Sequence, residues 1–525
     1  MKRVSTILLS LLFGSISMFA QLPANSPLSK PILWVKTDSA VLEAMQWRDI
    51  SGHGYNLIPQ SGTLPNYFSR LNFNKAFELE DEYFTASGLP FANRDMTAIV
   101  LYRVADTAEQ ALWQIRTGNS RVGLTSRQLL GTWGDMHYRD SNERITIVHT
   151  LFRNWDWKNS LPSSYTFELL SADSLPFHGR VSECLLFDWH IDDTTLIQYI
   201  SYLSLKYGIT LYETDYLSSS KQKVWDYHNH PDYSYSIAGL GRDDTLGLYQ
   251  KQSYMLDEKI ITGLQELAAT NEENLGTLAN GDYLIWGFDS SLLERTGMVY
   301  LDNGEEFEVY GNGLYQGTKG LTSEGTNDTP YTFMTVDGSS WQGTITNYYL
   351  LVDRSGTGAF RPEDIVFYVP DYVDTNNVLY FSDIQWDTDH NGIDRFCFTY
   401  VPVDSLLRDR NLLANGGSNE QQRGGDNGAK SRRDSRLKDK NINAGNSYRL
   451  YPNPSERDFI LEVDFAEKSN VTVKLYNPEG KLMDTKSATG RQTYRFPYQL
   501  SVSGQYLLEI SGGGETKTLK AVINK

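Results

Sequence analysis

Cysteine is almost absent from this sequence. Two cysteines in 525 residues exclude a disulfide-stapled scaffold and a cysteine-rich zinc protein. Basic residues are outnumbered, since 48 Lys and Arg face 65 Asp and Glu, which gives a net charge of −17. General binding to nucleic acid is excluded, because phosphates require a basic surface. A mean hydropathy of −0.44 excludes a polytopic membrane protein.

Aromatic residues, in contrast, are plentiful and make up 13% of the chain. Disordered chains are poor in aromatics, so most of this chain is expected to fold around packed cores. Its length corresponds to about three or four domains.

The first twenty residues have the layout of a secretory signal peptide. Lys2 and Arg3 precede an apolar stretch from Ile7 to Phe19, and Ala20 is a small residue suited to cleavage. The stretch is too short to span a hydrocarbon layer of ~30 Å comfortably, so a membrane anchor is the less favoured alternative. We expect residues 1–20 to be removed on export and the mature chain to have no transmembrane span.

Residues 22–212 are expected to form a β-sandwich. Short apolar runs separated by polar turn clusters predict many strands. The runs are Ile32–Val35, Ala98–Val104, Ile145–Phe152, Tyr165–Leu170 and Cys184–Trp189.

One helix is expected at the end of this region. Its buried stripe has helical spacing and consists of Leu196, Ile200, Leu203 and Tyr207. Asp193 or Thr194 is expected to cap its start, and Gly208 to end it.

Residues 213–405 are expected to form a second β-rich domain. The clearest strands are Asp282–Trp286, Met298–Leu301, Tyr348–Val352, Ile365–Tyr368 and Phe396–Val401. Residues 406–447 combine glycine, asparagine and charge with little to bury, which predicts a flexible linker. Its basic residues between Lys430 and Lys440 could contact a polyanion, but a solvated linker is favoured.

Residues 448–525 are expected to form a small β-sandwich. Val471, Val473 and Leu475 alternate with polar residues, as do Tyr506, Leu508 and Ile510. Between these strands, the segment Asn477-Pro478-Glu479-Gly480 has the residue order of a type I turn. The fold class is therefore mainly β throughout.

The C-terminal unit resembles the sorting domain of the bacterial type IX (Por) secretion system. The resemblance is carried by Tyr451-Pro452-Asn453-Pro454, Val471–Asn477, Gly480-Lys481, Gly504-Gln505-Tyr506-Leu507 and the basic end Lys517–Lys525. It implies passage through the periplasm and outer membrane, contact with the secretion machinery and its sorting protease, and removal of the tail. The protein would then be attached to surface lipopolysaccharide or released.

Residues 22–212 resemble a LamG/concanavalin-like jelly roll. The segment Trp47-Arg48-Asp49-Ile50-Ser51-Gly52-His53-Gly54 matches the early signature of that family. The strand Val181–Trp189 and the helix reaching Lys206-Tyr207-Gly208-Ile209 match its usual end. Residues 213–405 resemble an uncharacterised β-rich domain that follows such jelly rolls, with marks at Ile237–Asp244, Gln250–Ser253 and Gly281–Gly287; no chemistry is implied.

Signatures of known enzymes are missing from the sequence. It contains no HExxH, GxSxG, Walker A or CxxC motif. The E-x-D-x-x-E pattern of jelly-roll glycosidases is also missing from residues 22–212, where the jelly roll is expected. We therefore expect a protein that is not an enzyme, with a glycan-active enzyme as the least favoured alternative.

A calcium loop is predicted at residues 387–394. Asp387, Asp389 and Asn391 alternate before Gly392, and Asp394 adds another oxygen. This is the first half of an EF-hand-like loop, although Phe398 stands where a bidentate Glu belongs. A plain turn is the alternative. A second, weaker candidate is Asp353-x-Ser355-x-Thr357-Gly358, with Asp364 at position twelve.

Three other groups of residues have both a functional and a structural interpretation. Asp226, His228, His230 and Asp232 could ligate a metal from one strand face, but Pro231 favours a polar loop. Cys184 and Cys397 fall in different domains, which favours two buried thiols over a bridge. Trp113, Trp133, Trp155 and Trp157 could stack on sugars, but tryptophan is more often part of a core.

We expect a cell-surface or secreted protein for binding or adhesion, with a glycan or a host or matrix protein as its ligand. The alternative is a structural or accessory component of the surface layer or of the secretion and motility apparatus.

Deleting residues 448–525 tests the sorting assignment. Without the tail, the secretion machinery has nothing to recognise, so the truncated protein should accumulate in the periplasm. Cell fractionation and surface proteolysis measure its location. Normal surface display of the truncated protein would contradict the assignment.

Overall fold

The fold is mainly β, as expected. The computed structural model describes residues 28–400 and 446–523, with gaps of five or more residues at 138–142, 152–164, 301–305, 321–329, 342–347 and 452–457, and shorter gaps elsewhere. The expected signal peptide and nearly all of the expected linker lie outside the described residues. Two compact units emerge: residues 1–255, 267–290 and 316–327 form one, and residues 256–266, 291–315 and 328–525 form the other.

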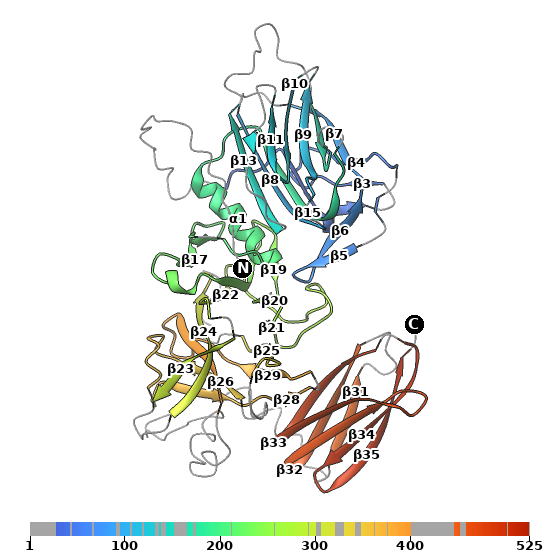
Figure 1. Cartoon of the computed structure of the whole chain (residues 1–525), viewed down its shortest axis with the longest axis vertical. Helices are drawn as coiled ribbons and strands as arrows, with labels where there is room; N and C mark the ends of the chain where they lie inside the picture. The colour runs from blue at the N-terminus through green and yellow to red at the C-terminus, as the bar shows by residue number, and fades with distance from the viewer. Residues whose placement is uncertain are drawn as a thin grey trace, which may run out of the picture. The chain divides into compact units, whose positions relative to one another are not determined.

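The first unit begins with a sandwich of two antiparallel sheets, drawn in blue and cyan in Figure 1. One sheet has the order β13-β8-β15-β6-β5, with β1 on β15, and the other has the order β12-β11-β10-β9-β14-β7-β4. The strands are β1 (Leu33–Lys36), β4 (Ile58–Pro59), β5 (Phe68–Leu71), β6 (Asn74–Glu80), β7 (Phe84–Leu89), β8 (Asp95–Val104), β9 (Ala111–Thr117), β10 (Ser120–Thr125), β11 (Gln128–Gly131), β12 (Met136–His137), β13 (Glu143–Leu151), β14 (Tyr165–Leu169) and β15 (His178–Phe187). A small hairpin adds β2 (Ala40–Val41) and β3 (Gln46–Trp47), next to the 3-10 turn η1 (Thr37–Ser39).

Apolar side chains that point inward at alternate positions of these strands form the core of the sandwich. On β9, Trp113 and Ile115 point inward, and on β14, Phe167 and Leu169 do the same. Because side chains on a strand alternate between faces, Arg116 and Glu168 point outward. The apolar runs expected from the sequence are confirmed as strands, with their ends shifted by a few residues.

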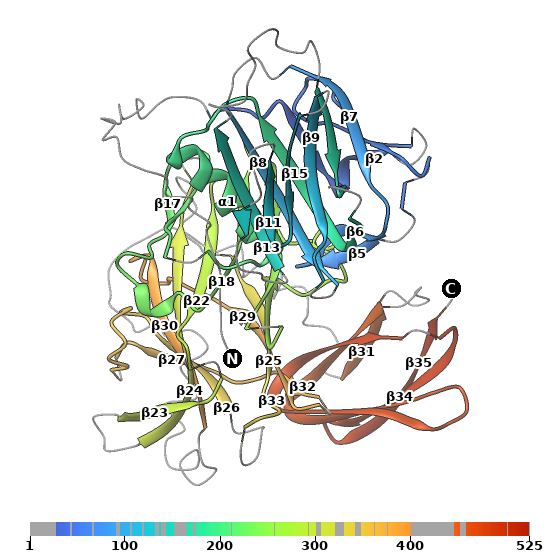
Figure 2. The same ribbon diagram turned by 45° about the horizontal axis from the view of Figure 1, so that its top comes forward.

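Helix α1 (Asp193–Tyr207) follows the sandwich, and both views draw it in green beside the sandwich strands (Figures 1 and 2). The expected stripe is buried, and Gly208 ends the helix in the left-handed conformation, with φ +69°. The expected N-cap was wrong by one or two residues. Asp192 is the cap, because its carboxylate accepts from the backbone N–H of Thr195 at 3.0 Å.

The end of α1 is held by two asparagines, Asn72 of the turn between β5 and β6 and Asn74 at the start of β6. Asn72 Nδ2 donates to the carbonyl oxygens of Leu205 and Lys206 at 3.3 and 3.2 Å. Asn74 Nδ2 donates to the Lys206 carbonyl at 2.6 Å. The last carbonyls of a helix lack partners within the helix, so these side chains join its end to the sandwich.

Short strands complete the first unit. They are β16 (Tyr216–Leu217), β17 (Lys223–Trp225), β18 (Ser236–Asp243), β19 (Leu248–Gln250), β20 (Gln252–Met255) and β22 (Tyr283–Phe288). The first two form a hairpin, in which Tyr216 lies opposite Trp225. Strand β18 pairs with β19 and with β22. The 3-10 turn η2 (Pro231–Tyr233) follows the hairpin.

The second unit contains two further groups of strands. One runs β21 (Ile260–Leu264), β25 (Thr332–Asp337), β29 (Val378–Ile384) and β28 (Tyr372–Val373). The other includes β23 (Arg295–Tyr300), β24 (Glu306–Thr318), β30 (Ile393–Tyr400), β26 (Tyr348–Asp353) and β27 (Ile365–Tyr368). The end of β24, from Gln316 on, belongs to the first unit. Strand β26 pairs with β30, which places Asp353 opposite Arg395.

The C-terminal part of this unit, red in Figure 2, is built on long strands. These are β31 (Ser447–Tyr451), β32 (Asp458–Tyr476), β33 (Leu482–Gln499), β34 (Gly504–Gly512) and β35 (Glu515–Ile523). Register shifts between Asp464 and Val471 interrupt the pairing of β32 with β33. Residues from both halves of β32 share one core. The turn expected at 477–480 is confirmed by the hydrogen bond from Gly480 N to Asn477 O at 2.9 Å.

A buried ion pair joins α1 to the sandwich. Glu183 of β15 is fully buried, and its Oε1 accepts from Lys206 Nζ at 2.7 Å and from the Tyr202 hydroxyl at 2.5 Å. Burial alone would raise the pKa of Glu183, but Lys206 and Lys36 outweigh it and hold that pKa below its ordinary value. The carboxylate is therefore charged and paired in the folded protein.

We expect the substitution Lys206→Met to destabilise the first unit by about 3–5 kcal/mol, because it leaves a buried carboxylate without its partner. The matched control is Lys75→Met, which removes the exposed pair with Glu272 at 3.6 Å; this should cost at most about 1 kcal/mol. Differential scanning calorimetry measures both. Equal losses of stability in the two variants would contradict a structural role for the buried pair.

The same pair predicts a dependence on pH. A carboxylate whose folded pKa is lowered adds stability above its unfolded pKa, and this stability is lost as the pH falls through the folded value. The difference in unfolding free energy between the Glu183→Gln variant and the unsubstituted chain should therefore shrink as the pH falls below ~4.

Candidate functional site

The four predicted calcium ligands lie in and beside the turn between β29 and β30. Asp387 and Asp394 are buried at the base of this turn, and Asp389 and Asn391 are exposed at its tip. Asp387 Oδ1 accepts from Gly392 N at 2.7 Å, and Asp389 Oδ2 accepts from Asn391 Nδ2 at 2.7 Å. The loop thus uses these oxygens for its own hydrogen bonds.

Asp394 faces a cation of the protein itself. Its Oδ2 accepts from Arg354 Nη1 at 2.9 Å and from Asp387 N at 2.6 Å, whereas its Oδ1 is buried with no hydrogen-bond partner in the described structure. Burial raises the pKa of Asp394 to about 6, although Arg354 acts in the opposite direction. At neutral pH the guanidinium and the carboxylate form a buried pair.

The second calcium candidate, the loop after Asp353, lies beside the first. Asn391 Nδ2 donates to the Arg354 carbonyl at 2.9 Å, and Arg395 Nε donates to the Gly356 carbonyl at 3.1 Å. The oxygens of Asp353 accept from the Ser355 backbone and hydroxyl and from Phe360 N. Pairing of β26 with β30 brings the two loops together, which spacing within either loop could not reveal.

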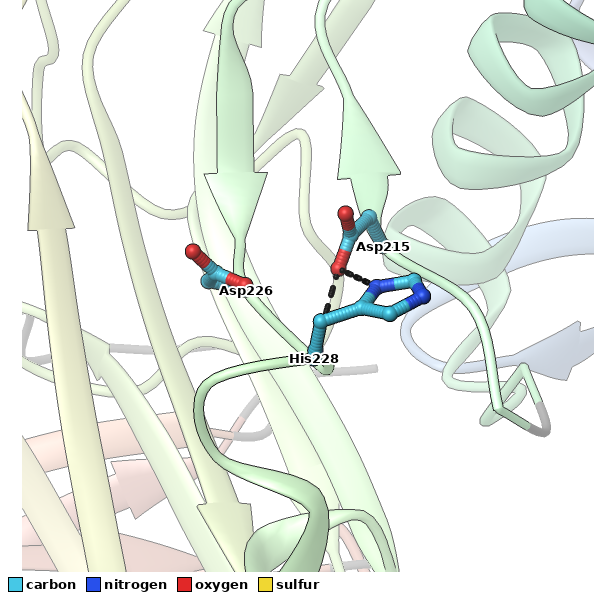
Figure 3. Close-up of side chains that lie close together, drawn as sticks. All are labelled: Asp215, Asp226 and His228. Atoms are coloured by element: carbon cyan, nitrogen blue, oxygen red, sulfur yellow. Dashed lines mark hydrogen bonds and ion pairs between the residues drawn. The ribbon is translucent and has the colours of Figure 1, made fainter.

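The group Asp226, His228, His230 and Asp232 folds as a loop, as favoured from the sequence. The N–H of His230 donates to the carbonyls of Asp226 and Tyr227, and Asp232 lies in the turn η2. Asp226 and His228 lie close together in the structure. The third member of their group is Asp215, not His230 or Asp232. Figure 3 draws these three side chains, with the imidazole of His228 against the carboxylate of Asp215.

The hairpin of β16 and β17 explains this arrangement. Asp215 immediately precedes β16, and Asp226 immediately follows β17, so both lie at the same end of the hairpin. His228 Nδ1 lies 3.0 Å from Asp215 Oδ1, and the backbone N–H of His228 donates to the same oxygen at 3.3 Å. Asp215 was missed from the sequence because it lies outside the D-x-H-x-H-x-D segment.

Lys223 lies between the two carboxylates. Its Nζ is 2.9 Å from Asp215 Oδ2 and 3.1 Å from Asp226 Oδ1. Burial disfavours the ionised form of each aspartate, but hydrogen bonds outweigh it: from His228 and Lys223 to Asp215, and from Lys223 and Asn229 to Asp226. Both pKa values are therefore lowered, and both groups carry a charge at neutral pH.

The outer face of the second sandwich sheet presents a grid of polar side chains. Across β7, β14 and β9, Thr166 lies opposite Ser87 and Arg116, and Glu168 lies opposite Thr85 and Gln114. Arg116 Nε is 3.4 Å from Glu168 Oε1. We call the residues Thr85, Ser87, Arg116, Thr166 and Glu168 the polar face; Gln114 is fully buried and is not part of it. Hydroxyl, guanidinium and carboxylate groups can bind sugar hydroxyls.

The tryptophan and cysteine candidates that the structure describes are buried. Trp113 is fully buried in the sandwich core, as favoured from the sequence, whereas Trp133, Trp155 and Trp157 lie outside the described residues. Cys184 and Cys397 are free thiols, which confirms the favoured alternative. Burial raises the pKa of each thiol above its ordinary value.

The C-terminal strands match a known family. Residues 449–524 match the family described as a secretion system C-terminal sorting domain. The chain carries a sorting domain. It is therefore exported to the outer-membrane surface or the extracellular space, and the domain implies interaction with the type IX secretion machinery. Among the described residues, no helix is both long and apolar enough to cross a membrane.

The central part of the chain matches a second family. Residues 196–390 match a domain of unknown function, DUF8202. A search of curated proteins found no similar sequence.

Solved structures show only distant similarity. The binding domain of botulinum neurotoxin DC in complex with SialylT is 10% identical, with 73% of this chain and 97% of that chain covered and a TM-score of 0.23. A Bacteroides uniformis β-glucuronidase is 12% identical over 37% of this chain and 26% of that chain, with a TM-score of 0.12. Dimeric latent PorU from Porphyromonas gingivalis is 10% identical over 88% and 34%, with a TM-score of 0.13. At these TM-scores the similarities carry no argument, and the LamG resemblance stays a prediction.

Calorimetry with Ca²⁺ tests the predicted calcium loop at residues 387–394. Because the loop oxygens must exchange existing hydrogen bonds for the ion, affinity should be in the weak extracellular range. Calcium at ten times its dissociation constant should stabilise the second unit by about 1.4 kcal/mol. Calorimetry of the full chain and of the Asp387→Ala/Asp389→Ala variant measures this. If millimolar Ca²⁺ neither binds nor raises the melting temperature of the unsubstituted chain, the loop is only a turn.

Proposed function

We propose that this chain is a surface-displayed or secreted binding protein without catalytic activity. The observation that carries the proposal is the sorting domain at residues 449–524, which brings the preceding units into contact with the cell exterior. A sorting domain is an address, so the function of the exported protein belongs to the residues before it.

The polar face of the sandwich is the surface that we assign to the ligand. Its residues lie on three neighbouring strands, which hold the side chains in fixed register. Glu168 is oriented before a ligand arrives by its ion pair with Arg116, at 3.4 Å, and by the hydrogen bond that it accepts from the buried Gln114 Nε2 at 2.5 Å. Such preorganisation lowers the entropic cost of binding.

A glycan is the ligand class that fits these groups best, with a host or matrix protein as the other candidate. Sugar hydroxyls both donate and accept hydrogen bonds, and the polar face offers donors in Arg116 and acceptors in Glu168. The neighbouring hydroxyls of Ser87 and Thr166 add groups that do either.

Array binding with a matched pair of variants tests the proposal. The full chain is applied to glycans and extracellular matrix proteins, alongside the variants Arg116→Ala/Glu168→Ala and Arg180→Ala/Glu78→Ala. The second variant removes a comparable ion pair, at 3.7 Å, from the other sheet. Loss of the first pair should weaken binding about tenfold or more, as expected when hydrogen bonds worth ~1 kcal/mol each are removed.

Three outcomes would count against the proposal. Equal losses of binding affinity in the two variants would show that the ligand does not bind at the polar face. Absence of any ligand on the arrays would favour a structural or accessory role. Hydrolysis of a polysaccharide that one carboxylate substitution abolishes would show an enzyme instead.

A further inference from the structure

We propose that Asp215, Asp226 and His228 form a binding site for a divalent transition metal, with zinc as the ion it takes. One ligand atom from each of the three residues lies within 4.8 Å of the other two. The group is formed by the end of a hairpin and the turn that follows it (Figure 3). None of its residues belongs to the polar face or to the loops at Asp353 and Asp387.

The donor set selects the class of ion. Zinc in proteins takes imidazole nitrogen and carboxylate oxygen, whereas calcium and magnesium take oxygen alone. The imidazole of His228 therefore favours zinc, and the two carboxylates supply charge that offsets that of the ion. Three protein ligands leave a fourth tetrahedral position open to water or to a donor from another molecule.

The distances are close to those that zinc requires. Zinc holds nitrogen and oxygen at ~2.0–2.2 Å, so two donors on one ion stand up to ~4 Å apart. His228 Nδ1 and Asp215 Oδ1 are already 3.0 Å apart. The three donors, within 4.8 Å of one another, need only a small approach.

The surrounding hydrogen bonds hold two ligands in place. The backbone N–H of Asp226 donates to Gln316 Oε1 at 3.0 Å, and Asn229 Nδ2 donates to Asp226 Oδ2 at 2.7 Å. His228 donates its own N–H to Asp215. Partners that orient metal ligands in this way raise the affinity of a site.

Lys223 contacts both carboxylates that the metal would bind. Its ammonium bridges Asp215 and Asp226, and its side chain is 39% exposed. An exposed lysine can turn into solvent at small cost, because surface ion pairs contribute little stability. Zinc binding is therefore an exchange of one cation for another. Displacing Lys223 lowers the affinity of the site for zinc.

Isothermal titration of the full chain with zinc chloride tests this site. We expect one zinc ion that is lost, or bound at least about tenfold more weakly, in His228→Ala and in Asp215→Asn. Lys223→Met should tighten zinc binding by roughly two- to fivefold, because it removes the competing cation. X-ray absorption of the zinc-loaded chain should show one imidazole among oxygen ligands.

The controls separate this site from adventitious binding. His53→Ala removes an exposed histidine from another loop of the same unit and should leave zinc binding unchanged. Melting curves without metal show whether each variant is folded. If zinc binds equally well to His228→Ala, or does not bind to the unsubstituted chain at submillimolar concentration, the proposal is overturned. An unchanged affinity in Lys223→Met would overturn the exchange with the lysine.

Discussion

The first unit depends on the pairing of Glu183 with Lys206. A carboxylate in the middle of a sheet is costly to bury, and only a charged donor with further hydrogen bonds offsets that cost. Lys206, Tyr202 and Tyr207 all come from α1, so the helix must lie on β15 for the strand to be stable. Asn72 and Asn74 then hold the end of the same helix. One buried charge thus joins strand, helix and turn into one body.

The sequence predicts the elements of this body better than it predicts their contacts. Alternation and helical spacing located the strands, the stripe of α1 and the role of Gly208, because these follow from local geometry. The stripe did not predict that Tyr202 and Lys206 are buried too, since their partner Glu183 belongs to a strand. The cap is Asp192 instead of the expected Asp193 or Thr194, because neighbouring aspartate and threonine side chains offer similar capping oxygens. The order of strands in the sheets was not accessible from one sequence.

Sites made by pairing of distant segments were the least predictable. The Asp387 loop was found because its residues alternate within one turn, but its neighbour Arg354 follows another strand, β26, and is paired with Asp394. Likewise, Asp226 and His228 stood out in the sequence, whereas Asp215 joined them only through the hairpin. In both places the missing member was an ordinary charged residue with no local signal. Its role arises from strand register, which the sequence alone does not show.

The same arrangement recurs at three places, and burial separates their roles. In each, a basic side chain contacts carboxylates: Lys206 with Glu183, Arg354 with Asp394, and Lys223 with Asp215 and Asp226. The side chains of Lys206 and Arg354 are only 6% and 10% exposed, so removing either cation would leave an unpaired charge in a medium of low dielectric. Lys223 is 39% exposed and can be hydrated as it leaves. Among these three clusters, only the one at the hairpin can exchange its cation with ions in the surrounding medium, and export brings that medium to it.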